Sequence, residues 1–226
     1  MIVLALDPPP STDPERWCRS ILSRVFGHPA LAGVKIGLPA IVARGLSWVQ
    51  SVLRDARDLL KVADLKLADV GAIMRIVLEN LASAGFDAAI LHAFVGREGA
   101  LDEAADWAKS HGVKLIAVVS MSHPGSRQFI DRHTSEMVET CLSLGFWGFV
   151  APATRVDMIK LVRKLAPSAK ILSPGVGAQG ARPGDALRAG ADYEIVGRAI
   201  TRAPDPREAM NRIAEEQRRA LESLNR

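Results

Sequence analysis

The sequence has few of the features that mark secreted, metal-binding or membrane proteins. Its 226 residues include two cysteines, Cys18 and Cys141, which form no CxxC pair. This count excludes a disulfide framework, and we expect both cysteines to be buried thiols in a reducing compartment. No apolar run approaches the ~20 residues that a membrane-spanning helix needs. Residues 1–7 reach an acid too soon for a signal peptide, so we expect a cytoplasmic protein.

A strong charge of one sign is also missing. Lys and Arg number 29 against 25 Asp and Glu, and no basic block or aromatic-interleaved patch occurs. We therefore expect no nucleic-acid partner. A net charge of +4 is compatible with an anionic small molecule as the ligand. It can equally reflect a solvated surface that is slightly basic. Asn and Gln together number seven, and scarcity of these labile amides is typical of thermophilic proteins.

Eight short apolar runs, rich in β-branched residues, recur along the chain, and helical patterns lie between them. Continuous apolar runs are typical of parallel strands that are covered on both faces. The predicted strands are Ile2–Leu6, Gly33–Ile36, Val62–Leu67, Ala88–Leu91, Lys114–Val119, Trp147–Val150, Lys170–Leu172 and Tyr193–Val196. The predicted helices are Pro39–Arg57, Ile73–Ala84, Gly99–His111, Asp131–Leu144, Arg155–Leu165 and Pro206–Leu224.

Eight strand–helix units without a linker or a change in composition predict an α/β fold, a single (β/α)8 TIM barrel over residues 1–226. A doubly wound open sheet is the alternative, although such sheets more usually have about five to seven strands. Gly85, Gly112 and Gly145 each follow a helical run, and we expect each to stop it in a left-handed conformation.

Polar or glycine-rich residues end seven of the eight predicted strands. In barrels of this kind the catalytic groups lie at the carboxyl ends of the strands. The residues at these ends are Asp7, Lys35, Asp64 with Lys66 and Asp69, His92, Ser120–Ser122, the run 173–180 and Gly197 with Arg198. So many polar ends at one rim predict an active site there. For His92 we favour a hydrogen-bonded packing role, which is the more frequent one.

The third predicted strand carries the most informative pair. Its period-two alternation places Asp64 and Lys66 on one face, toward the barrel lumen. Two opposite charges there are costly to desolvate unless they pair, and one interpretation is a structural salt bridge. We favour a functional site, because Lys35 and Asp69 can extend the pair into an alternating Lys–Asp–Lys–Asp chain. Such a chain would hold Lys66 charged and fixed, as a proton donor requires.

The loop after the seventh strand contains Gly175, Gly177 and Gly180, which match GxGxxG. A dinucleotide-binding fold would place this loop after its first strand, so we reject that interpretation. The ends of strands seven and eight of a barrel commonly hold a phosphate, and Arg198 supplies a bidentate donor for it. The segment 175–184 is also long enough to close over a ligand as a lid.

Three segments carry a resemblance to a known family. Residues 64–70 read DLKLADV, residues 121–125 read MSHPG, and residues 173–180 read SPGVGAQG. The first is similar to the DxKxxDI signature of orotidine 5′-monophosphate decarboxylases. The other two resemble that family's fifth- and seventh-strand loops, particularly in archaeal members. They are the more specific part, since related sugar-phosphate decarboxylases and synthases share DxKxxD.

The resemblance implies a homodimeric enzyme without cofactor or metal that converts orotidine 5′-monophosphate (OMP) to UMP and CO2 in pyrimidine biosynthesis. It implies that Lys66 protonates C6 of the pyrimidine while Asp64 lies beside the substrate carboxylate. Lys35 and Asp69 complete the implied catalytic set, with Asp69 acting in the partner subunit's site. The implied substrate contacts are Asp7 and Lys35 to ribose hydroxyls, Ser122 to the pyrimidine amide edge, Gln179 and Arg198 to the phosphate, and Pro174, Gly177 and Gly197.

One departure from the family pattern follows the signature. Many relatives continue with Ile-Pro and a Thr that reaches the neighbouring site, whereas residues 70–73 here read Val-Gly-Ala-Ile. The Thr hydroxyl is therefore absent, and Ile73 stands in its place.

Two other functions stay open. A 3-keto-gulonate-6-phosphate decarboxylase or hexulose-phosphate synthase on the same barrel uses carboxylates around Mg2+, and Lys35 where a second acid would stand disfavours it. A barrel that only binds a phosphosugar, as a sensor or scaffold, is the non-enzymatic alternative, and the intact charge chain disfavours it.

Overall fold

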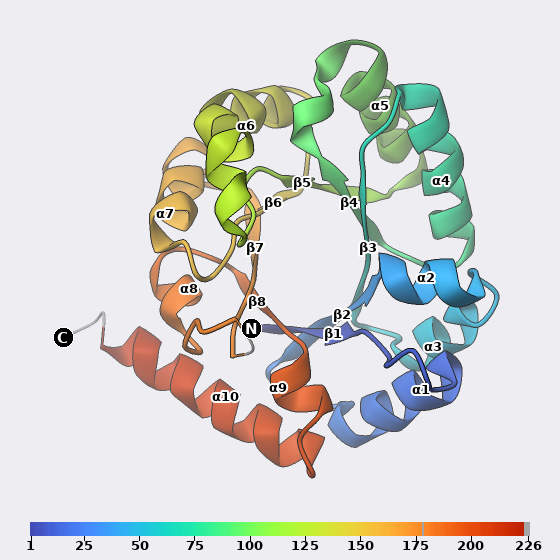
Figure 1. Cartoon of the computed structure of the whole chain (residues 1–226), viewed down its shortest axis with the longest axis vertical. Coiled ribbons are helices and arrows are strands. Elements are labelled where there is room, and N and C mark those ends of the chain that lie inside the picture. The colour runs from blue at the N-terminus through green and yellow to red at the C-terminus, as the bar shows by residue number, and fades with distance from the viewer. Residues whose placement is uncertain (178, 224–226) are drawn as a thin grey trace.

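The computed structural model of the chain describes residues 1–177 and 179–223. Eight parallel strands form one closed barrel in which each strand pairs with the next and β8 pairs with β1. The helices surround this ring of strands (Figure 1). The closed barrel confirms the predicted (β/α)8 fold and excludes the open sheet.

The strands are β1 (Ile2–Leu6), β2 (Leu31–Gly37), β3 (Leu60–Leu67), β4 (Ala88–His92), β5 (Lys114–Val118), β6 (Gly148–Val150), β7 (Lys170–Pro174) and β8 (Tyr193–Val196). The α-helices are α1 (Pro14–Val25), α2 (Leu38–Arg44), α3 (Val49–Asp55), α4 (Gly71–Ser83), α5 (Asp102–His111), α6 (Thr134–Ser143), α7 (Val156–Leu165), α8 (Asp185–Arg188), α9 (Arg198–Thr201) and α10 (Pro206–Glu222). Four short helical turns are η1 (Ala93–Val95), η2 (Arg97–Leu101), η3 (Pro124–Gln128) and η4 (Ile130–His133).

The strands are apolar on both faces because each face is buried. In β1, Val3 and Ala5 belong to the cluster that fills the barrel, whereas Ile2, Leu4 and Leu6 pack outward against the helices. The barrel cluster also contains Val62, Ala88, Ile90, Ile116, Val118, Val150, Leu172 and Ile195. Two layers of apolar contact therefore fix the strand ends, from which the polar side chains project.

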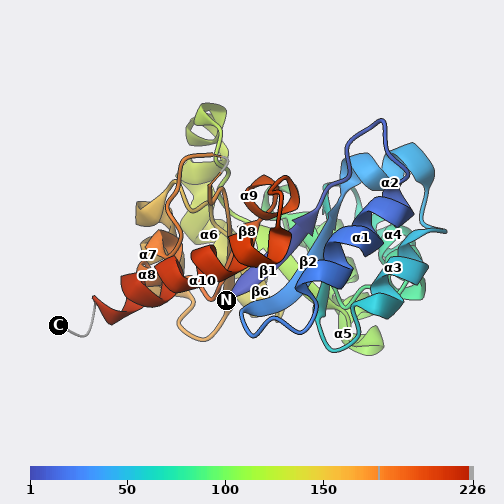
Figure 2. The same ribbon diagram turned by 90° about the horizontal axis from the view of Figure 1, so that it is seen from below.

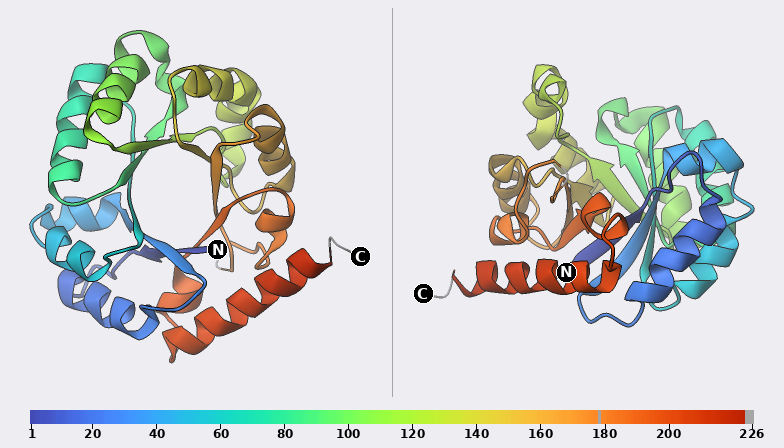
Figure 3. Two further views of the ribbon diagram at one scale, coloured as in Figure 1. Left: turned by 180° about the vertical axis from the view of Figure 1, so that it is seen from behind. Right: turned by 60° about the horizontal axis from the view of Figure 1, so that its bottom comes forward.

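The segments that carry the candidate residues rise from one end of the barrel. Figure 2 shows the segment after β1, helix α2 after β2 and helix α9 after β8 together at that end. The long helix α10 runs across the outside of the barrel and contacts α1, α8 and α9 (Figure 3). The carboxyl rim is therefore the shared location that the sequence predicts.

Three predicted helices need correction. The predicted helix Pro39–Arg57 is two helices, α2 and α3, because Gly45 ends α2 with a left-handed φ of 67°. The predicted helix from Gly99 begins only at Asp102, because Gly99 itself has a φ of 70° inside the turn η2. The predicted helix from Asp131 begins at Thr134, after the 3₁₀ turn η4.

Other boundaries are close to the prediction. The last helix ends at Glu222, and Leu224, its predicted end, lies outside the described residues. The helices α8 and α9 have four residues each, too few to show a helical period in the sequence. The predicted glycine stops at 85, 112 and 145 are confirmed by φ values of 95°, 68° and 77°.

Both cysteines are buried and unpaired, as predicted. Burial raises the pKa of the Cys141 thiol to about 12, and burial with the charge of Asp7 does the same for Cys18. Neither thiol is a reactive nucleophile near neutral pH. Over residues 1–177 and 179–223, none of the helices is both long enough and apolar enough to cross a membrane.

A fully buried carboxylate fixes the end of the loop after β7. Glu194 in β8 accepts the Gly184 N–H at 2.9 and 3.0 Å, the Ala186 N–H at 3.3 Å and the Gln217 side-chain amide at 2.8 Å. Glu194 therefore ties the end of this loop and the start of α8 to β8 and α10.

We expect Glu194→Ala to lower the free energy of unfolding by roughly 3 kcal/mol, because it leaves buried N–H donors without an acceptor. Denaturant unfolding followed by circular dichroism measures the change. Glu216→Ala, at an exposed position of the same helix as Gln217, is the control and should change stability by less than about 0.5 kcal/mol. Equal losses in the two variants would contradict the anchoring role.

Candidate active site

Four charged side chains from β3 and from the ends of β1 and β2 form one chain of ion pairs. Lys35 Nζ lies 3.4 Å from Asp7 Oδ1 and 3.2 Å from Asp64 Oδ2. Lys66 Nζ donates to the other oxygen of Asp64 at 2.8 Å. The predicted contact between Asp64 and Lys66 is therefore present, and Lys35 extends it as expected.

Burial and charge act in opposite directions on this chain. The Lys35 and Asp64 side chains are 8% and 12% exposed, whereas that of Lys66 is 37% exposed. Burial alone would lower the pKa of Lys35, but the charges of Asp64 and Asp7 outweigh it and raise that pKa. Burial alone would raise the pKa of Asp64, but Lys35 and Lys66 outweigh it and lower that pKa. Both buried groups stay charged at neutral pH, and Lys66 is the cation with the freer approach.

The backbone at Lys66 is irregular. Its φ is 48°, in the left-handed region that residues other than glycine rarely adopt. The pairing of β3 with β4 also shifts register here, since Ala63 pairs with Ala89 but Leu67 pairs with Leu91. Bulges of this kind re-aim a side chain, and strain at one residue is typical of functional sites. Simple strand alternation predicts the correct face for Lys66 but misses the bulge that aims it.

A hollow of about 400 Å³ opens beside the chain of ion pairs. Its lining residues are Asp7, Lys35, Gly37, Leu38, Pro39, Asp64, Leu65 and Lys66. At Gly37 an added Cβ would lie 2.6 Å from Asp7 Oδ1 and 3.3 Å from Lys35 Nζ. A glycine at position 37 is therefore required for the carboxylate of Asp7 to approach Lys35. The sequence analysis gives Gly37 no role, and its place two residues after Lys35 was the available signal.

The loop after β7 lies against the start of α9, as a phosphate site there would require. An added Cβ at Gly177 would lie 2.9 Å from the Cβ of Ala199, which follows Arg198. The loop is closed by the Gly177 N–H, which donates to the Ala181 carbonyl at 2.9 Å. Gln179 Oε1 lies 3.0 Å from the position of a Cβ on Gly175. The structure thus brings the two glycine-rich strand ends together; Ala178 lies outside the described residues.

The remaining predicted residues lie around the same rim. Gly197 follows β8, and an added Cβ there would lie 3.4 Å from the Cβ of Ala5 in β1. Pro174 is the last residue of β7 and is half-buried. Ser122 and Arg198 are exposed, Ser122 in the segment between β5 and η3 and Arg198 at the start of α9.

Asp69 does not extend the ion-pair chain within one subunit. It is exposed, and its Oδ1 accepts the N–H of Val70 at 2.8 Å. Asp7 supplies the terminal acid instead, so the chain runs Asp7–Lys35–Asp64–Lys66. A role for Asp69 in a partner's site stays a prediction.

His92 lies closer to the charges than a simple packing role suggests. Burial and the charge of Lys66 lower the pKa of His92, so the ring is neutral at neutral pH. Its centroid lies 4.6 Å from that of Phe94. Within residues 1–177 and 179–223, its buried Nδ1 has no hydrogen-bond partner. The ring packs as expected, but the expected hydrogen bond at Nδ1 is not made.

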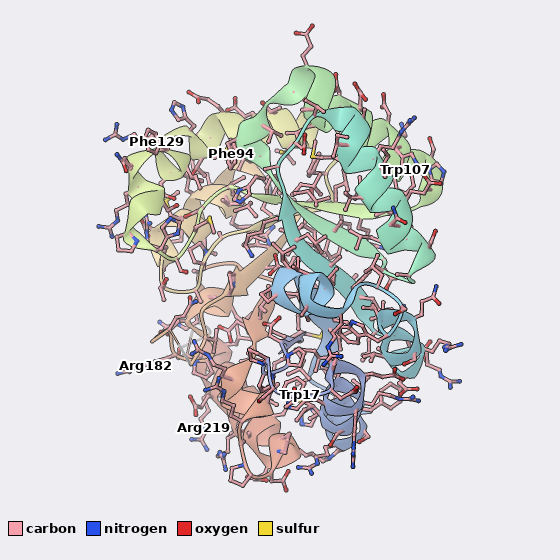
Figure 4. The ribbon with its side chains drawn as sticks, turned by 45° about the vertical axis from the view of Figure 1, so that its right-hand side comes forward. Trp17, Phe94, Trp107, Phe129, Arg182 and Arg219 are labelled. Atoms are coloured by element: carbon pink, nitrogen blue, oxygen red, sulfur yellow. The ribbon has the colours of Figure 1, made fainter. Side chains whose placement is uncertain are left out.

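A second, apolar hollow of about 570 Å³ lies between η1 and α6. Exposed Phe94 and Phe129 line it and lie on one side of the molecule in Figure 4. Of its lining residues only His133 and Glu136 have ionisable side chains, and the two lie 2.6 Å apart. This hollow therefore has no buried chain of charges like the one beside Lys66. Among the described residues no three His, Cys, Asp or Glu side chains lie close enough to hold a metal ion.

Comparison with known proteins gives consistent matches. Residues 1–213 match the sequence model of the Orotidine 5′-phosphate decarboxylase / HUMPS family. An orotidine 5′-phosphate decarboxylase from Aeropyrum pernix is 46% identical over 216 residues, which are 95% of this chain and 87% of that protein. The crystal structure of orotidine 5′-monophosphate decarboxylase from Metallosphaera sedula is 36% identical, with a TM-score of 0.81 and coverage of 97% and 98% of the two chains. The Methanocaldococcus jannaschii enzyme, complexed with the inhibitor BMP, has a TM-score of 0.85 at 29% identity and covers 96% and 97%.

Proposed function

Because this chain belongs to the orotidine 5′-phosphate decarboxylase / HUMPS family, we propose that it converts OMP to UMP and CO2, a step of pyrimidine biosynthesis. The enzyme class, a carboxy-lyase, follows from the names of relatives that match nearly its whole length. The observation that carries the proposal is the buried ion-pair chain that ends in Lys66 beside a hollow.

The charge chain accounts for the proposed chemistry. When the C6–CO2 bond breaks, its electron pair stays on C6, which the pyrimidine ring cannot delocalise as an enolate would. Lys66 then gives one proton to C6, and its neutral amine takes a proton from solvent. A fixed cation beside the developing charge stabilises the transition state, and Asp64 holds that cation at 2.8 Å. Asp64 itself would lie beside the substrate carboxylate.

The remaining contacts divide the substrate into three parts. Asp7 and Lys35 would bind the ribose hydroxyls, and Ser122 would bind the amide edge of the pyrimidine. Gln179 and Arg198 would hold the phosphate, with Pro174, Gly177 and Gly197 lining the site. Binding energy from the phosphate would close the loop 175–184 over the site and exclude water, which contributes to the rate without touching C6.

The proposal includes a homodimer in which Asp69 acts in the partner subunit's site. Val70, Ile73 and Ile76 are 58%, 45% and 52% exposed and lie three residues apart at the start of α4. Leu38 and Val42 form a similar exposed pair on α2. Apolar surface of this kind beside Asp69 supports an interface. Ile73, which replaces the usual Thr, would bury apolar area there in place of a hydroxyl contact.

The proposal is tested by the loss of orotidine absorbance when purified protein is mixed with OMP. We expect turnover that EDTA does not reduce, and a cytoplasmic location for the enzyme. Loss of activity in EDTA would favour the metal-dependent sugar-phosphate enzymes that use this barrel. Binding of UMP without any turnover of OMP would favour the sensor alternative.

A further inference from the structure

A buried polar cluster lies behind the loop that follows β5. Asp131 in η4 is its centre: Oδ1 accepts from the Ser120 hydroxyl at 2.8 Å and from the Ser126 hydroxyl at 2.7 Å. Oδ2 accepts from Arg155 Nη1 at 2.7 Å. One carboxylate therefore joins the end of β5, the turns η3 and η4, and the segment before α7.

Burying these polar and charged side chains costs free energy, which suggests that the cluster serves to fix the conformation of the loop. Ser120 and Ser126 are 0% and 1% exposed, and the Asp131 and Arg155 side chains are 7% and 13% exposed. A buried ion pair adds little net stability over apolar packing, but it can specify one arrangement of the chain. Few other buried contacts can hold the surrounding segment, since residues 122–125 and 127–129 are exposed. The carboxylate of Asp131 is thus one internal support of this loop.

Ser126 connects the cluster to the candidate substrate site. Its hydroxyl accepts the N–H of Met121 at 3.0 Å while it donates to Asp131. The hydrogen bond fixes the peptide group that enters Met121, the residue immediately before Ser122. Ser120, by contrast, donates to the same carboxylate oxygen, whereas the Met121 N–H donates to Ser126 and not to Ser120.

We propose that Asp131, acting through Ser126, is a positioning residue that sets the place of Ser122 at the pyrimidine end of the site. The inference rests on the proposed function, in which Ser122 reads the amide edge of the base. Asp131 touches no reacting atom. Asp131 accepts a hydrogen bond from the Ser126 hydroxyl, and this hydroxyl accepts one from the Met121 N–H. The backbone at Met121 in turn sets the position of Ser122. Arg155 secures Asp131 from the neighbouring strand end, so the loops after β5 and β6 are held as one unit.

The test compares Ser126→Ala with Ser120→Ala. Each variant removes one buried hydroxyl from the same oxygen of Asp131, but only Ser126→Ala frees the Met121 N–H. We expect Ser126→Ala to lower kcat/KM for OMP by about ten- to a hundredfold, because small misplacements of a binding group have effects of this size. UMP should bind more weakly to this variant by a similar factor. Inhibition by ribose 5-phosphate, which has no base, should stay within about twofold of wild type.

Ser120→Ala should lower kcat/KM for OMP and the affinity for UMP by a smaller factor than Ser126→Ala does, because it leaves the hydrogen bond between Ser126 and the Met121 N–H in place. If Ser126→Ala does not fold, Asp131→Asn provides the same comparison. The amide oxygen of the new side chain can still accept from a serine, but its NH2 group cannot accept from Arg155. The contact that holds residue 131 in place is therefore lost, and we expect the same selective loss toward ligands with a base.

Two outcomes separate this inference from the proposed function. A wild-type chain that turns over OMP while both serine variants lose equal activity overturns the positioning role alone. So does a parallel loss of affinity for UMP and ribose 5-phosphate, which would indicate general damage to the site. A wild-type chain that neither converts OMP nor binds UMP overturns the proposed function and this inference with it.

Discussion

Alanine in place of Lys66 is expected to lower kcat for OMP decarboxylation by at least about a thousandfold, since it removes both the proposed proton donor and a fixed charge. UMP should still bind, because the phosphate and ribose contacts that we propose come from other residues. The prediction depends on Lys66 being the more exposed cation of the chain, 37% against 8% for Lys35. Turnover by absorbance and UMP affinity by calorimetry measure the two parts separately.

A lysine at the other end of the same strand is a matched control. Lys61 also lies in β3 and also forms an ion pair, 3.0 Å from Asp87. Lys61→Ala removes an equal charge and a comparable ion pair at the amino end of the barrel, away from the site. It should keep kcat within about twofold of wild type. Full activity in Lys66→Ala, or equal losses in the two variants, would remove Lys66 from the role of proton donor.

The barrel could be predicted because its cause is repeated along the chain. Eight apolar runs that need cover on both faces leave few architectures, and the closed sheet is the one observed. Helix boundaries were less accurate where single residues decide them. Gly45 divides one predicted helix into α2 and α3, and Gly99 delays the start of α5. The periodic spacing of apolar residues does not show where a single residue adopts a left-handed φ.

The site could be predicted in part, for a related reason. Asp64 and Lys66 share a face of one strand, so their contact is local in sequence. Asp7 follows a different strand, β1, and its contact with Lys35 depends on Gly37 having no side chain. The bulge at Lys66 arises from the pairing of β3 with β4, which no single strand encodes. Contacts that depend on the close approach or the register of two strands can therefore be predicted only once the fold is known.

The cluster around Asp131 shows the same limit. The sequence motif covers residues 121–125 and does not include Ser126, and Asp131 was predicted only as the start of a helix. Its side chain instead takes three hydrogen bonds from Ser120, Ser126 and Arg155. Those partners are up to 24 residues away along the chain. A carboxylate that holds a loop in place has no local signature, because its partners come from segments that follow two different strands.

The dimer hypothesis gives the second large effect. If Asp69 acts in the partner's site, Asp69→Ala should be nearly inactive, as Lys66→Ala should be. A hybrid dimer with one chain of each kind nevertheless keeps one site in which both residues are present. Co-expression with two different tags and purification through both gives this hybrid. We expect it to have about half of the wild-type activity per dimer, since one of two symmetry-related sites is intact.

A second hybrid controls for nonspecific recovery. Lys35 and Lys66 belong to one ion-pair chain within a subunit, joined through Asp64. A hybrid of Lys35→Ala with Lys66→Ala therefore damages both sites and should stay inactive. Recovery in the Asp69 hybrid alone supports an interface at the exposed apolar face of α4, where Val70 and Ile73 lie. An inactive Asp69 hybrid, isolated as a stable dimer, would mean that Asp69 serves its own subunit and that each site is built from one chain.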